Sequence, residues 1–171
     1  MYSISRIKLT IALFITSFLI ACADYPMSFN NRNVFEEDPL FTNYEIADVA
    51  LAACVKQSIA DQKASRSNGL LHLNCSEAGI MSLAGIETFY ALEHLNVSSN
   101  EISKLDEINS LGRLETLDIS NNSITSVVRL SDLNHLSKVD LSGNAALDCA
   151  STKVLSEIVG SGLSLPDHCK N

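Results

Sequence analysis

The sequence predicts an α/β solenoid, a short horseshoe with parallel strands on its concave face and a helical cap at each end. A period of 22 residues runs through residues 70–146, where apolar side chains recur at the same positions of every unit. Such periods are typical of solenoids, because each unit buries its apolar face only against its neighbours. The chain has 171 residues, which is enough for one domain of this kind.

The repeat is visible as columns of residues spaced 22 positions apart. They include Leu70, Leu92, Leu114 and Leu136; Leu73, Leu95, Leu117 and Val139; Cys75, Val97, Ile119 and Leu141; and Asn100, Asn122 and Asn144. The pattern resembles the leucine-rich repeat, in which each unit supplies one strand and strands pair in parallel about 4.8 Å apart. The recurring asparagine is placed to bond the backbone of neighbouring turns. Ala78 occupies its position in the first unit, so we expect that unit to be looser or to be supported by the preceding cap.

Residues 42–69 are predicted to form the N-terminal cap, with a helix from about 43 to 63. Thr42 and Glu45 have the spacing of a capping box at the start of a helix. One apolar stripe is expected to face the first repeat, made of Ile46, Val49, Ala50, Ala53, Cys54 and Val55.

Residues 147–171 are predicted to form the C-terminal cap. A short helix that stops at Gly160 is expected to carry four apolar residues on one face, Val154, Leu155, Ile158 and Val159. The chain then returns through 163–166 to Cys169 and closes the far end of the solenoid.

The first 21 residues have the features of a signal peptide, with two basic residues followed by an apolar run over 9–20. The run is too short to span a bilayer as a helix. It ends at Leu19-Ile-Ala-Cys22, which resembles the lipobox of bacterial lipoproteins. That resemblance implies cleavage before Cys22 and lipid, including palmitate, on this cysteine, with Ala23 favouring the outer membrane. Residues 22–41 show no periodicity and are interpreted as a flexible tether.

Of the five cysteines, four remain when Cys22 is assigned to the lipid, and four cysteines allow three pairings. Proximity in a stacked fold favours Cys54 with Cys75 and Cys149 with Cys169, because the mixed pairings would join opposite ends of the solenoid. Four reduced thiols are the alternative, which an exported chain disfavours. The sequence has no C-x-x-C motif, so it does not support a zinc ribbon or a thioredoxin-type site.

Composition and motifs argue against several function classes. The formal net charge of -8 disfavours nucleic-acid binding through a basic face, and the absence of tryptophan disfavours a carbohydrate-stacking platform. Residues 160–164 have neither the order G-x-S-x-G nor the order G-x-G-x-x-G, and the acids are spread along the repeat surface. We therefore expect no enzyme activity and no cofactor.

The candidate binding surface is the outward side of the predicted strands. Side chains alternate along a strand, so the positions between the inward leucines face out. These positions give a first column of His72, His94, Thr116 and Lys138, a second of Asn74, Asn96, Asp118 and Asp140, and a third of Ser76, Ser98, Ser120 and Ser142. We expect a ligand to contact His72, His94, Thr116, Asp118, Lys138 and Asp140.

Two features of this surface have competing interpretations. His72 and His94 could share a metal ion, but two ligands on one flat face fall short of a site, and we expect no metal. Asp118 beside Asp140 is a like-charge pair that disfavours packing, which Lys138 or a basic partner would relieve.

Taken together, the residues resemble small bacterial leucine-rich-repeat lipoproteins, related in repeat type to internalins. That resemblance implies a monomeric module that binds an unidentified protein or peptide and is held at the bacterial cell envelope by its lipid. The alternative is a structural envelope lipoprotein without a specific ligand, because a fold does not fix a function.

Overall fold

The computed structural model describes residues 28–29, 32–33 and 39–170. The predicted signal peptide, Cys22 and most of the predicted tether lie outside the described residues. Within the tether, β1 (Ser28–Phe29) and β2 (Arg32–Asn33) pair in antiparallel fashion. They belong to a unit separate from the one that begins at Pro39, which contains the repeats.

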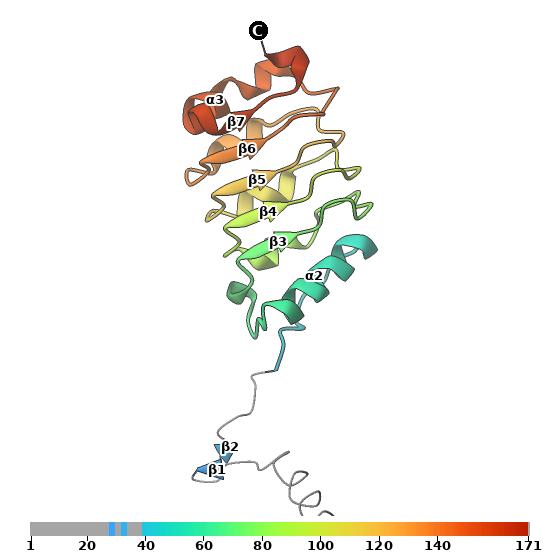
Figure 1. The fold of residues 1–171 in the computed structure, drawn as a ribbon, viewed down its shortest axis with the longest axis vertical. Helices are drawn as coiled ribbons and strands as arrows, with labels where there is room; N and C mark the ends of the chain where they lie inside the picture. The colour runs from blue at the N-terminus through green and yellow to red at the C-terminus, as the bar shows by residue number, and fades with distance from the viewer. Residues whose placement is uncertain (1–27, 30–31, 34–38, 171) are drawn as a thin grey trace, which may run out of the picture. The chain divides into compact units, whose positions relative to one another are not determined.

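The repeat unit is built on a parallel sheet of five strands in the order β3-β4-β5-β6-β7, stacked between helices α2 and α3 (Figure 1). The first four are the repeat strands, β3 (His72–Asn74), β4 (His94–Asn96), β5 (Thr116–Asp118) and β6 (Lys138–Asp140). Their register pairs residues 22 positions apart, for example Leu73 with Leu95, so the predicted register is confirmed. The fifth strand, β7 (Leu163–Ser164), comes from the C-terminal cap and pairs Val139 with Leu163, outside the 22-residue period.

The repeat columns form one continuous apolar core behind the sheet. Every aliphatic column member named above is at most 4% exposed, as is Cys75. The opposite layer consists of short 3-10 helices, η2 (Ile86–Phe89), η3 (Asp106–Ser110) and η4 (Val128–Asp132), which turn further column members such as Phe89 inward. This arrangement is the predicted α/β solenoid.

The N-terminal cap differs from the prediction at its start. Helix α2 (Val49–Asp61) begins six residues later than expected, and its N-cap is Asp48, so the capping box at Thr42 is wrong. The predicted stripe is also partly wrong: Val49 is 83% exposed, whereas Leu51 is fully buried and was not included. One further member, Ala53, is exposed, and one further residue that was not included, Ile59, is buried.

Residues before α2 are held by aromatic packing instead of by a helical turn. The rings of Phe41 and Tyr44 both meet Phe89 edge to face, with centroids 6.1 and 5.4 Å away. Because Phe89 is fully buried under the first repeat, these contacts attach the start of the cap to the core. A short 3-10 helix, η1 (Ser67–Gly69), then leads from α2 into β3.

The C-terminal cap contains η5 (Cys149–Thr152), α3 (Lys153–Val159), η6 (Gly160–Gly162) and η7 (Asp167–Cys169). As predicted, α3 ends at Gly160, whose φ of 59° is readily adopted by glycine. Only half of the predicted stripe is buried, since Val154 and Ile158 remain 53% and 36% exposed.

Two disulfides fasten the caps. Cys54 of α2 is joined to Cys75 beside β3, with Cα atoms 5.8 Å apart, and Cys149 is joined to Cys169, with Cα atoms 5.3 Å apart. These are the pairs that the sequence favours. Each closes a loop of about 20 residues, which corresponds to about 3 kcal/mol in the chain-entropy model. Among the described residues, no helix is long and apolar enough to span a bilayer.

Candidate functional site

The outward side of the strands forms a hollow of about 500 Å³. Its floor is made by the first and second columns of β3 to β6, which the register places side by side. The end of α2 adds a wall through Ser58, Asp61 and Gln62. All six residues of the predicted binding face lie in this lining, namely His72, His94, Thr116, Asp118, Lys138 and Asp140.

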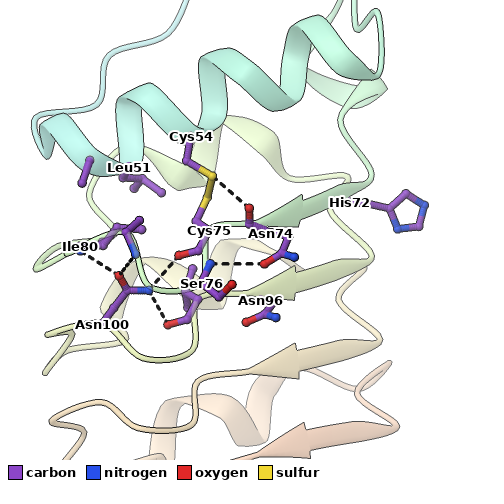
Figure 2. Close-up of a disulfide and its surroundings, with 12 residues drawn as sticks. Leu51, Cys54, His72, Asn74, Cys75, Ser76, Ile80, Asn96 and Asn100 are labelled. Carbon is purple, nitrogen blue, oxygen red and sulfur yellow. Dashed lines mark hydrogen bonds between the residues drawn. A yellow bond between two sulfur atoms is a disulfide. The ribbon is translucent and has the colours of Figure 1, made fainter.

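The strands that carry these side chains are held in place by a ladder of buried asparagines. Asn100 Oδ1 accepts hydrogen bonds from the backbone N–H of Ile80 at 2.9 Å and of Ala78 at 3.1 Å (Figure 2). Its Nδ2 donates to the carbonyl of Cys75 at 2.9 Å in the preceding repeat. Asn122 and Asn144 make corresponding bonds one and two repeats further on. The predicted role of this column is therefore confirmed.

The first repeat lacks this asparagine and is supported by the cap through Asp48. Oδ1 of Asp48 accepts from the N–H of Ala50 and Leu51 at 3.0 Å, which caps α2. Oδ2 accepts from the N–H of Met81 at 2.9 Å and of Ser82 at 3.1 Å, in the loop that follows Ala78. One carboxylate therefore joins the cap to the first repeat.

These hydrogen bonds also shift the pKa of the Asp48 carboxyl. Partial burial raises the pKa of Asp48, but the four backbone donors, with Leu51 the strongest, outweigh burial and hold the pKa below its ordinary 3.8. Asp48 was not among the residues predicted from the sequence. Its signal was an aspartate directly before an apolar run, which is a preferred N-cap.

The second column is partly committed to structure. Oδ1 of Asp118 accepts from the backbone N–H and the Oγ of Ser120, at 3.0 and 2.7 Å. Asp140 bonds Ser142 in the same way, at 2.9 and 2.6 Å. The two aspartates thus stabilise the turns that end their strands, a role that the sequence did not predict beside their like-charge contact and their place in the binding face. Asn96 makes the same turn with its Oδ1, 2.9 Å from the N–H of Ser98.

The side chains of the first column do not stabilise turns in this way. Among the described residues, the side chains of His72, His94, Thr116 and Lys138 make no hydrogen bond or ion pair. The two imidazoles are stacked, with ring centroids 4.7 Å apart and planes 9° apart. His72 extends from the start of β3 away from the cap disulfide (Figure 2). This column is therefore the part of the face that is available to a ligand.

Gln62, at the end of α2, fixes the exposed edge of the sheet at His72. Its Nε2 donates to the His72 carbonyl at 2.6 Å, and its Oε1 accepts from the His72 N–H at 3.4 Å. The amide replaces a neighbouring strand and protects an edge that would otherwise present unpaired backbone groups. No sequence signal identifies this residue, because its partner is a backbone group ten positions away.

A second cluster of metal-ligand types lies in the C-terminal cap. Ligand atoms of Cys149, His168 and Cys169 lie within 4.8 Å of one another. The two sulfurs are bonded to each other, however, and His168 Nε2 lies 3.0 Å from the Leu147 carbonyl, to which it donates. A disulfide sulfur is not a thiolate and is a poor metal ligand. We therefore interpret this cluster as a structural link that holds the C-terminal cap together.

Comparison with known proteins supports the repeat assignment. The family model of leucine-rich repeats in two copies matches residues 112–155. An internalin (inlF) from Listeria monocytogenes has a similar structure, with a TM-score of 0.60, 23% identity, and coverage of 70% of this chain and 36% of that chain. Internalin C2 from the same organism is also similar, with a TM-score of 0.57, 23% identity, and coverage of 70% of this chain and 53% of that chain.

The chain thus spans between about a third and a half of the internalin chains it resembles. Among curated proteins, no sequence matches it. At this identity the likeness concerns the fold alone. The parallel sheet, the asparagine ladder and the matched repeats identify the fold as an α/β leucine-rich-repeat solenoid.

Proposed function

We propose that this chain is a protein- or peptide-binding module that acts through its strand face and is held at the bacterial cell envelope by lipid on Cys22. The observation that carries the binding role is the hollow of about 500 Å³, whose first column of side chains makes no hydrogen bond or ion pair among the described residues. Side chains that neither fill the core nor stabilise a turn contribute little to folding, and a solenoid presents them on one extended surface.

The charge of the hollow favours a basic partner segment. Its lining contains Asp61, Asp118 and Asp140 against Lys138, and the whole chain carries a formal net charge of -8. Because Asp118 and Asp140 use one carboxylate oxygen for their turns, the other is left to accept from a lysine or arginine of the partner. The four repeat strands span only about 15 Å, so we expect a small footprint and modest affinity unless clustering in the membrane adds avidity.

The test uses whole cells in which a photo-crosslinking residue replaces Thr116. Crosslinking is compared between the parent chain and variants that lack acidic side chains. The variant Asp118→Asn with Asp140→Asn is suitable, because Asn96 shows that an amide oxygen maintains the same turn. We expect it to retain the fold and to lose most of the crosslinked partner. The matched control, Glu107→Gln with Asp132→Asn, removes the same charge from η3 and η4 on the opposite layer and is expected to leave crosslinking unchanged.

Loss of crosslinking in the control pair but not in the strand-face pair would place binding on another surface. The absence of any crosslinked partner at Thr116 would favour the alternative, a structural envelope lipoprotein without a specific ligand.

The lipid anchor is tested separately. The motif Leu19-Ile-Ala-Cys22 supports cleavage before Cys22, and Ala23 in the next position supports the outer membrane. Cys22→Ala is expected to abolish incorporation of labelled palmitate and to release the chain from the outer-membrane fraction. Labelling that persists in this variant would exclude Cys22 as the site of acylation.

A further inference from the structure

We propose that His72 and His94 form a binding site for a divalent transition-metal ion such as Zn²⁺, at the end of the hollow next to α2. The two residues are register partners on β3 and β4, and their rings are stacked 4.7 Å apart. The sheet therefore holds two imidazoles side by side, and this proposal reverses the expectation of no metal that the sequence alone gave. The two histidines belong to the proposed binding face, but the metal site does not require a peptide partner and is tested with the metal alone.

The backbone beneath the pair is fixed on both sides. Parallel pairing holds β3 to β4, and the Gln62 amide bonds both backbone groups of His72 from the other edge. The rings themselves remain free to turn, since their nitrogens make no hydrogen bond among the described residues. Two nitrogens bound to one tetrahedral ion at about 2.1 Å are about 3.4 Å apart. Binding requires the exposed ring of His72 and the half-buried ring of His94 to turn from the observed stacking until one nitrogen of each reaches that separation.

The chemistry of the surroundings suits a borderline-soft dication. Neutral imidazole is a preferred ligand of Zn²⁺, Ni²⁺ and Cu²⁺. Asp61 lines the same hollow, and its Oδ1 accepts from Gln57 Nε2 at 2.8 Å, so its carboxylate adds negative potential to the hollow. Two protein ligands leave the other coordination positions open toward the hollow, where water or a carboxylate or imidazole of a bound peptide completes them.

The experiment is calorimetric titration of the purified full-length chain, in detergent, with ZnCl₂ and NiCl₂. We expect a one-to-one complex in the micromolar range. His72→Ala and His94→Ala are each expected to weaken metal binding at least about tenfold. In either variant one imidazole binds alone, without the gain in affinity that a second ligand held close by provides. The control His135→Ala, on an exposed connecting segment, leaves the affinity unchanged.

A gain of affinity gives an independent readout. Thr116 is the register partner of His94 on β5, so Thr116→His extends the column to three imidazoles. This variant is expected to bind about tenfold more tightly if the column chelates the ion. Unchanged affinity in both alanine variants overturns the proposal. So does a complex that is lost only in His168→Ala, because the metal would then lie in the C-terminal cap.

Discussion

Replacing Asp48 with alanine removes one carboxylate that serves two elements of the structure. The loss of the α2 N-cap costs about 1 kcal/mol in typical proteins. The bonds to the N–H groups of Met81 and Ser82 are charge-assisted, but these groups are exposed and water replaces part of the interaction, so each adds about 0.5–1 kcal/mol. We therefore expect Asp48→Ala to lower the free energy of unfolding by about 2–3 kcal/mol. The melting temperature should fall by roughly 6–15 °C.

The variant Asp48→Asn is expected to lose only one of the two sets of hydrogen bonds that Asp48 makes. An amide retains one acceptor oxygen and turns an N–H₂ group toward the other pair of donors, so only the helix or the loop of the first repeat is satisfied. About half of the loss is expected. The control is Asp106→Ala, since the Asp106 side chain is 66% exposed and, among the residues that the structure describes, is paired only with Arg129 at 4.0 Å. Such a surface pair contributes little, and the change should stay within about 0.5 kcal/mol.

The effect of Asp48 also depends on pH, with a defined sign. Because its pKa in the folded chain lies below the ordinary 3.8, the unfolded chain binds the proton first as the pH falls. The stabilisation is therefore complete well above pH 3.8 and is lost as the pH drops through the folded pKa. Urea denaturation followed by circular dichroism, at a series of pH values from neutral to below 3, measures the gap between the parent chain and Asp48→Ala. A gap that does not shrink on acidification, or a control as damaging as Asp48→Ala, would refute this account.

Three further predictions concern the rest of the scaffold. Asn122→Ala leaves the buried N–H of Ile102 without its partner and removes one hydrogen bond each from the carbonyls of Val97 and Ile119, so it should lower the free energy of unfolding by about 2–4 kcal/mol; a urea-denaturation change below about 1 kcal/mol would contradict the ladder. Gly85→Ala is expected to be strongly destabilising, because φ is 98° and a Cβ would lie 2.2 Å from a carbonyl oxygen of the cap, whereas Gly112→Ala meets open space and should melt like the parent. Replacing Cys54 and Cys75 together by serine should cost about 3 kcal/mol, and an unchanged melting temperature would show that the cap docks without its disulfide.

The sequence by itself determined the parts of the fold that repeat. A 22-residue period places the same side chain in the same environment several times, so the inward columns, the register of β3 to β6 and the outward columns all follow from one spacing. The asparagine ladder was predicted for the same reason, since each amide bonds the preceding repeat. The residues of the hollow were predictable because alternation along the strands fixes which side chains face out.

Only the tertiary structure decided the features that occur once. Thr42 had the better local capping pattern, but Asp48 is the N-cap, because its second oxygen also bonds a loop more than thirty residues away. Gln62 at the edge of β3 and the fifth strand β7 likewise depend on partners that no periodic pattern marks. A contact that repeats in every unit appears several times in the sequence, so any one copy predicts the others. The contacts that close the two ends of a solenoid occur once, between segments that only the folded chain brings together.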